Sequence, residues 1–162
     1  MSHPALILTI QSSWAEAQPA GNEDCRAGAR SRTYSTAMTK YLIVGVGGCL
    51  GSILRFWVAE YVGTRMGARF PYGTFIVNCT ACFLIGLSVT ILAEKANWSS
   101  NWRYLIPIGF IGGYSTFSTF EFETFRVIQE GEFLMAGLNV VLSVVVGFIS
   151  VWLGVITGRT IA

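Results

Sequence analysis

The sequence predicts an all-α integral membrane protein with four transmembrane helices. Of its 162 residues, 52% are hydrophobic and only 12% are charged, whereas about a quarter of the residues in a soluble domain are charged. From residue 38 onward, four apolar segments each approach the roughly 20 residues that a helix needs to span a bilayer. We therefore expect a multi-pass protein of the cell inner membrane.

Charge, cysteine content and the arrangement of reactive residues disfavour other classes of protein. The net charge is +2 and the basic residues occur singly, so no nucleic acid partner is expected. Nucleophile, base and orienting group form no recognisable constellation, so the chain is not expected to be an enzyme. The four cysteines lie mostly within apolar runs, which favours packing over a disulfide or a metal site.

Residues 1–37 differ in composition from the rest of the chain. They mix glycine, proline and charged residues without a period, which predicts a disordered and dispensable extension. The apolar residues 4–10 are too few to span a membrane, and no clean cleavage site follows them, so a signal peptide is not expected. Residues 38–162 are expected to form the functional domain.

The four predicted spans are separated by short connections, which predicts a compact bundle. The first span contains Arg55 and Glu60, whereas the second and fourth contain no charged residue. The third carries Glu121 and Glu123 in its second half, and we expect these glutamates to cap or pair where the third helix ends. The predicted spans cover residues 41–62, 73–93, 103–128 and 133–157.

Basic residues near the spans give little preference for one orientation. Four lie on the side of the N-terminus and three on the opposite side, and such residues normally mark the cytoplasmic side. A nearly balanced count allows insertion both ways, so two copies are expected to pack in lipid as an antiparallel, dual-topology homodimer. The residues counted are Lys40, Lys95, Arg103 and Arg159, and on the other side Arg65, Arg69 and Arg126.

The third span contains a signal for a helix broken in the middle of the membrane. Gly112 and Gly113 are followed by hydroxyl residues, and unwound backbone at that depth is tolerated only inside protein or beside a cavity. If two antiparallel copies meet at the break, the carbonyls of Gly112 and Ser115 from each would enclose one Na⁺ on the symmetry axis. The alternative is a glycine kink in which Ser and Thr bond back to the helix.

Several polar and aromatic residues are candidates for an anion path. The amide of Asn78 offers two donors that can replace water around a small anion, although an interhelical hydrogen bond is the alternative. Phe117 and Phe120 share a helix face with Ser118 between them, and aromatic edges carry partial positive charge. Such a pair of phenylalanines also occurs in ordinary packing.

Two further features extend this path. Asn139 and Ser143 lie four residues apart on the fourth span and so share a face, which predicts a polar track. Arg55 lies within the first span, where it either forms an electropositive vestibule or extends to the lipid headgroups.

Short motifs follow one another in a specific order from residue 38 onward. They are Gly47-Gly48-Cys49-Leu50-Gly51 with Arg55, Gly73-Thr74 through Val77-Asn78 to Phe83 and Gly86, Gly109-Phe110-Ile111-Gly112-Gly113, and Thr116-Phe117-Ser118-Thr119-Phe120. In this order and spacing they resemble the CrcB/Fluc family of fluoride channels over residues 38–162.

The resemblance implies a fluoride-selective channel that lowers cytoplasmic fluoride by passive export. It implies two pores per antiparallel homodimer, a structural Na⁺ at the dimer centre, and a pore lined by Asn78, Phe117 and Phe120 beside Thr116 and Ser118. The sequence departs from the family pattern at three places. They are Ala81, where glycine is usual, Ser115, where threonine is common, and Asn139, where tyrosine is often seen.

Two alternatives remain at this point. A small proton-coupled exporter can also be a four-helix dual-topology dimer, but it would need a central carboxylate in the first span, where this chain has Arg55 and, near the end, Glu60. A membrane assembly protein that transports nothing would leave the Gly-Gly pair and the polar row unexplained. It predicts that loss of Asn78 changes no ion flux.

Overall fold

The computed structural model describes residues 26–67, 70–94, 99 and 101–162, with side chains from residue 38 onward. The chain divides into two compact units, Met1–Thr36 and Ala37–Ala162. The second unit carries every predicted span and is described below. All regular elements among the described residues are helices, and these residues contain no β-strand. Among them, three helical stretches are long and apolar enough to cross a membrane, namely Met38–Met66, Tyr72–Glu94 and Phe133–Ile161.

Helix α2 (Arg26–Met66) contains the first span but begins earlier than the sequence predicts. The composition of residues 1–37 predicts disorder, whereas the backbone of residues 26–37 is helical. Alanine and arginine are strong helix formers, so a helix that is already nucleated extends easily through this segment. Residues 1–25 lie outside the described part of the chain. That the extension is dispensable stays a prediction.

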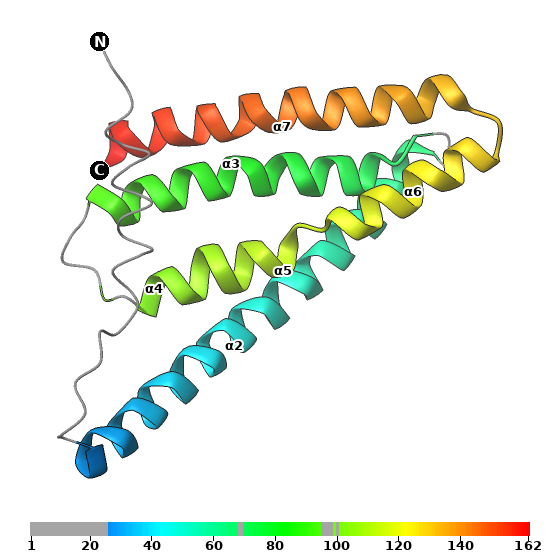
Figure 1. The fold of residues 1–162 in the computed structure, drawn as a ribbon. Helices are drawn as coiled ribbons and strands as arrows, with labels where there is room; N and C mark the ends of the chain where they lie inside the picture. The colour runs from blue at the N-terminus through cyan, green and yellow to red at the C-terminus, as the bar shows by residue number, and fades with distance from the viewer. Residues whose placement is uncertain (1–25, 68–69, 95–98, 100) are drawn as a thin grey trace. The chain divides into compact units, whose positions relative to one another are not determined.

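Helices α3 (Tyr72–Glu94) and α7 (Phe133–Ile161) lie side by side along their lengths (Figure 1). Both are uninterrupted apolar runs, close to the second and fourth predicted spans. Glycine lets the two backbones approach, because a Cβ added at Gly86 would overlap the carbonyl oxygen of Val151. Small residues at such contacts favour helix association in lipid, where no hydrophobic drive between helices exists.

The third predicted span, residues 103–128, is divided in the structure. Its pieces are α4 (Asn101–Arg103), the π-helix η1 (Tyr104–Ile111), α5 (Gly112–Tyr114) and α6 (Phe117–Gln129). Pro107 lies inside η1, and the wider π-helical turn accommodates a residue that has no N–H and whose ring clashes with the carbonyl four residues before it. Ser115 and Thr116, between α5 and α6, have extended backbone.

This interruption falls just after the Gly112-Gly113 pair rather than at it. Gly112 has α-helical dihedral angles, φ −62° and ψ −35°. Gly113 serves close packing, since a Cβ added there would lie 2.5 Å from the carbonyl oxygen of Gly48 on α2. The pair therefore keeps the helix and admits a neighbouring backbone, and the extended conformation belongs to Ser115 and Thr116, which follow the helical Tyr114.

Helix α2 crosses η1 and α5 in backbone contact. A Cβ added at Gly47 would lie 2.5 Å from the carbonyl oxygen of Leu105, and one at Gly51 would overlap that of Phe110. The Ser52 hydroxyl donates to the Gly113 carbonyl at 3.4 Å. These contacts fix the helical segment that precedes the interruption against α2.

A tight turn returns the chain from α6 to α7. Gly131 has φ +82°, its N–H donates to the carbonyl of Ile128 at 3.0 Å, and the N–H of Glu132 donates to the carbonyl of Val127 at 3.1 Å. This pair of bonds is a Schellman motif, in which glycine takes the left-handed conformation that ends a helix. The turn places the start of α7 against the end of α6.

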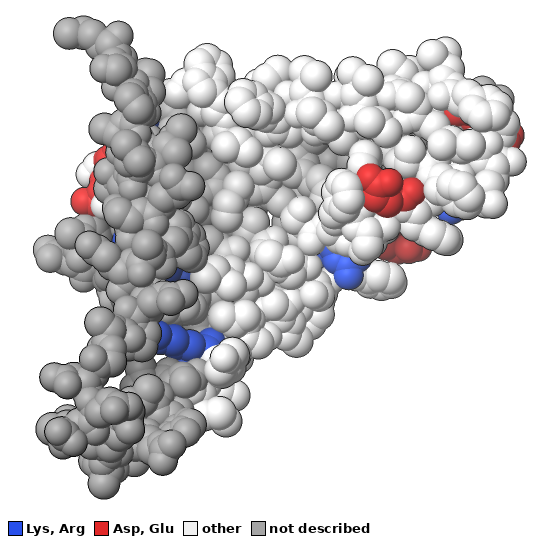
Figure 2. All heavy atoms as spheres, in the orientation of Figure 1, with Lys and Arg blue, Asp and Glu red and all other residues white. Residues whose placement is uncertain are grey.

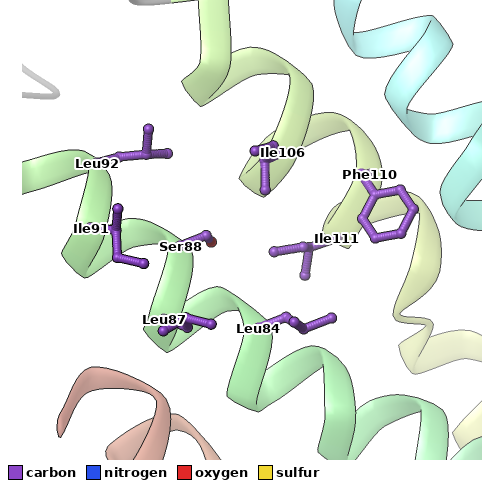
Figure 3. A pocket seen from close by; sticks show the side chains of 8 residues that line it. All are labelled: Leu84, Leu87, Ser88, Ile91, Leu92, Ile106, Phe110 and Ile111. Carbon is purple, nitrogen blue, oxygen red and sulfur yellow. The ribbon is translucent and has the colours of Figure 1, made fainter. Parts of the chain in front are cut away.

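Large apolar side chains are exposed on the outer faces of the long helices. Phe148 on α7 is 77% exposed, and Figure 2 shows few charged side chains over α3 and α7. An apolar groove of about 240 Å³ lies between α3 and η1, and Ile106 and Ile111 project into it from η1 (Figure 3). Exposed apolar surface of this extent is typical of contact with lipid or with another protein surface.

Candidate functional site

The extended residues Ser115 and Thr116 are held by one side chain of α3. Oδ1 of Asn78 accepts the backbone N–H of Thr116 at 3.2 Å and the hydroxyl of Ser115 at 3.1 Å. Nδ2 of Asn78 donates to the carbonyl of Thr116 at 3.3 Å. The amide thereby satisfies polar groups that the interruption deprives of helical partners. One of its two N–H donors remains for another acceptor.

The carbonyls of Gly112 and Ser115, the predicted cation ligands, lose their usual donors. In an α-helix a carbonyl accepts the N–H four residues further on, which would come from Thr116 and Thr119. The N–H of Thr116 is donated to Asn78 instead, and that of Thr119 is donated to Oγ1 of Thr116 at 3.4 Å. Both carbonyls can therefore face a cation without the loss of a helical hydrogen bond.

Hydroxyl groups gather at the N-terminus of α6. Thr116 is the N-cap residue, and its Oγ1 lies 3.3 Å from Oγ of Ser118 and 3.2 Å from Oγ1 of Thr119. A helix N-terminus carries partial positive charge, and its first N–H groups favour anions. The hydroxyl cluster of Thr116, Ser118 and Thr119 therefore stands where a negative charge is stabilised.

The two predicted pore phenylalanines contact each other but differ in exposure. Their ring centroids are 5.8 Å apart, with an angle of 39° between the ring planes. Phe117 is 74% exposed, whereas Phe120 is only 7% exposed. Phe117 thus lies at the surface of this chain beside the exposed Ser118, and Phe120 packs inside.

A second polar group joins α6 to α7. Nδ2 of Asn139 donates to Oγ1 of Thr124 at 2.7 Å, and the Thr124 hydroxyl donates to the carbonyl of Phe120 at 2.7 Å. Ser143 donates to Oδ1 of Asn139 at 3.4 Å, and Asn139 is 1% exposed. The predicted polar row on α7 is thus anchored to α6. The sequence reasoning missed Thr124, whose only signal is its place four residues after Phe120 on the same helix face.

Two charged side chains of the predicted spans have no partner among the described residues. Oε2 of Glu123 is buried without a hydrogen bond, so the predicted capping or pairing is not seen at this residue. At that end of α6 the ion pair joins Arg126 to Glu130, 3.6 Å apart. Arg55 is half-buried on α2, and within the described chain no ion pair or hydrogen bond links it to the groups around Asn78.

Side chains that commonly ligate metals do not gather in the described part of the chain. No three His, Cys, Asp or Glu residues lie where they could hold an ion together. The described cysteines, Cys49, Cys79 and Cys82, carry free thiols. The predicted cation ligands at the interruption are the backbone carbonyls of Gly112 and Ser115, and hard cations accept oxygen ligands of this kind.

Comparison with known proteins gives concordant matches. A family model described as CrcB-like protein, Camphor Resistance (CrcB), matches residues 42–155. A relative from Acidobacterium capsulatum, named fluoride-specific ion channel FluC, is 49% identical over 122 residues, which cover 75% of this chain and 98% of the relative. Relatives of the same name from Solibacter usitatus and Geotalea daltonii are 43% and 41% identical, and the aligned regions cover 98% and 100% of those proteins.

Proposed function

This chain belongs to the CrcB-like protein family, and from that membership we propose that it is a fluoride channel subunit of the cell inner membrane. The family consists of ion channels and not of enzymes. In this proposal fluoride leaves the cytoplasm passively, down its own gradient, through a pore in each of two associated copies.

The interruption at Ser115 and Thr116 carries this proposal. We propose that α4 to α6 together form a fourth membrane crossing, with the interruption near mid-depth. Backbone without helical hydrogen bonds is tolerated there only inside protein or beside a water-filled cavity. The hydrogen bonds of Asn78 show how this chain satisfies the extended residues. An ion path beside the start of α6 explains why the chain keeps such a feature.

Fluoride in this path would exchange water for protein donors at the hydroxyl cluster. Selectivity in channels depends on groups that replace the hydration shell of the ion. Thr116 and Ser118 supply hydroxyl donors, and the ring edges of Phe117 and Phe120 supply partial positive charge. Asn78 chiefly holds the cluster in place and offers its remaining N–H.

Polar groups on α7 and α2 extend the proposed path. Ser143 and Asn139, joined to Thr124 on α6, continue a row of hydrogen-bonding groups between otherwise apolar helices. Arg55 would attract anions into a vestibule, because a positive charge near a low-dielectric wall raises the local anion concentration.

We further propose an antiparallel homodimer with one structural Na⁺ at its centre. Gly112 and Ser115 of each copy would hold the ion through their carbonyls, which the local hydrogen bonding leaves free of their usual donors. The ion would supply positive charge that holds four carbonyl dipoles together, and so it would join the two interruptions. The nearly balanced basic residues of the loops support insertion in both orientations.

The experiment that tests this function is fluoride release from liposomes that contain the purified full-length protein. A fluoride electrode would follow release from liposomes loaded with potassium fluoride once valinomycin lets K⁺ follow, with liposomes loaded with potassium chloride measured in parallel. We expect rapid fluoride release without chloride release, and loss of fluoride release in Phe117→Ile, which removes an exposed aromatic ring. Phe148→Ile, an equally exposed phenylalanine on α7, is the matched control and should release fluoride normally. No release from dimeric wild-type protein would overturn the proposal.

One observation favours a second candidate, a proton-coupled exporter. One carboxylate oxygen of Glu123, Oε2, is buried without a partner among the described residues, and acidic residues within membrane segments can mark ion or proton pathways. Such an exporter would move fluoride together with a compensating proton flux. A channel would instead move net charge, and this difference can be measured.

A further inference from the structure

A buried tyrosine makes a second connection between the interruption and α3. The hydroxyl of Tyr114 lies 2.9 Å from Oγ1 of Thr80, and Tyr114 is 4% exposed. Oγ1 of Thr80 also lies 2.8 Å from the carbonyl oxygen of Ile76 and 3.0 Å from that of Val77. Carbonyls only accept, so the threonine proton goes to α3 and the tyrosine donates to the threonine. A buried tyrosine hydroxyl needs such a partner.

The two connections hold consecutive residues. Tyr114 is the last helical residue before the interruption, and Asn78 holds the next two, Ser115 and Thr116. Thr80 follows Asn78 closely on α3, so one short stretch of a continuous helix fixes residues 114–116. The carbonyls of Gly112 and Ser115 lie on either side of Tyr114 in the chain. A displacement of Tyr114 would therefore shift both carbonyls.

We propose that Thr80 and Tyr114 are positioning residues, which set the spacing of the Gly112 and Ser115 carbonyls for the cation. This inference rests on the cation site of the proposed function. Phe110, which borders the apolar groove (Figure 3), stacks on Tyr114 with ring centroids 6.2 Å apart and planes 1° apart. Tyr114→Phe would therefore keep the ring and its stacking and lose only the donated hydrogen bond.

The test is thermal unfolding of the full-length protein in detergent while Na⁺ replaces choline at constant ionic strength. A cation that binds only the folded protein raises the Tm with its concentration. We expect Tyr114→Phe and Thr80→Val each to raise about five-fold the Na⁺ concentration that produces a given rise in Tm, as for the loss of one hydrogen bond. The double variant should match the single variants, because they share one contact. Thr80→Ser, which keeps the hydroxyl, should restore the wild-type response.

Failure of this inference can be distinguished from failure of the proposed channel function. A merely structural role predicts a lower Tm at every Na⁺ concentration but the wild-type rise in Tm for the same Na⁺ concentration, and that result would overturn the inference. A wild-type Tm that does not respond to Na⁺ would overturn it as well. Fluoride release from liposomes is measured separately, so a protein that responds to Na⁺ but releases no fluoride would contradict the proposed channel and leave the positioning role supported.

Discussion

Single side chains determine where this chain departs from regular helix. Asn78 accepts the N–H of Thr116, which has no helical acceptor, and also donates to the Thr116 carbonyl. Thr124 joins α6 to α7 in a similar way. Its hydroxyl accepts from the amide of the buried Asn139 and donates to the carbonyl of Phe120 in its own helix. In lipid, where no water can substitute, such amide and hydroxyl groups depend on each other. Their removal should therefore be visible as lost stability.

We expect Thr124→Val to destabilise the protein by about 1–3 kcal/mol, because it leaves the amide of the buried Asn139 without its acceptor. Thermal or denaturant unfolding in detergent measures the change. Thr157→Val is the control, since the Thr157 hydroxyl donates only to the carbonyl of Leu153 within its own helix. The double change Thr124→Val with Asn139→Leu should recover most of the loss. Equal destabilisation by the two single threonine changes would contradict this role.

The long helices follow from local runs of apolar residues, whereas the interruption depends on contacts between residues that lie far apart in the sequence. The uncharged runs predicted at 73–93 and 133–157 correspond to α3 and α7, because a long apolar segment in lipid has no alternative to a helix. The site of the interruption was less accessible to sequence reasoning. It depends on Asn78, which lies far from Thr116 in the sequence, and on backbone contact between Gly113 and Gly48.

The same reasoning explains which site residues could be predicted. Asn78, Ser115, Thr116 and Ser118 were recognisable as polar groups within apolar segments, and the structure brings them together. Their mutual bonds were not predictable, because the sequence left open whether the amide of Asn78 contacts an anion or makes an interhelical hydrogen bond. The structure shows the interhelical bonds, to the backbone of Thr116 and to the hydroxyl of Ser115. Which site residues contact fluoride or Na⁺ stays a prediction.

Close helix contact gives a prediction at the scale of elements. Gly51→Ala would drive a Cβ into the carbonyl of Phe110, so α2 must separate from η1, at a cost of about 1–3 kcal/mol. Gly45→Ala on the same helix meets no atom within 4 Å and should leave the Tm unchanged or slightly raised. Both can be compared by thermal unfolding in detergent. A normal Tm in Gly51→Ala would show that α2 and η1 are not in backbone contact.

At the scale of the whole molecule, the chain presents apolar side chains on its long helices and few charges to fix its orientation. We therefore expect a multi-pass chain of this kind to enter the membrane both ways. A second copy in the opposite orientation would bring two interruptions together and complete a set of carbonyls around a cation. The proposed arrangement can be tested by measuring the orientation of the copies in the membrane.

Dual topology predicts that both ends of the bundle are found on both sides of the membrane. With the native cysteines replaced by alanine, Glu132→Cys places one exposed thiol in the turn between α6 and α7, at a residue whose side chain caps no helix. An impermeant maleimide should label about half of these thiols in intact cells, and all of them after permeabilisation. Labelling of all or none in intact cells would mean a single orientation and would exclude the antiparallel homodimer.

The measurement that tests the central claim most directly is fluoride release from liposomes loaded with potassium fluoride, recorded before and after valinomycin is added. A fluoride channel moves net charge, so release should be slight until valinomycin lets K⁺ follow and then become rapid. Liposomes with the same potassium fluoride load and valinomycin but without the protein provide the control. Full fluoride release by the protein without valinomycin would mean electroneutral, proton-coupled transport and would contradict the channel.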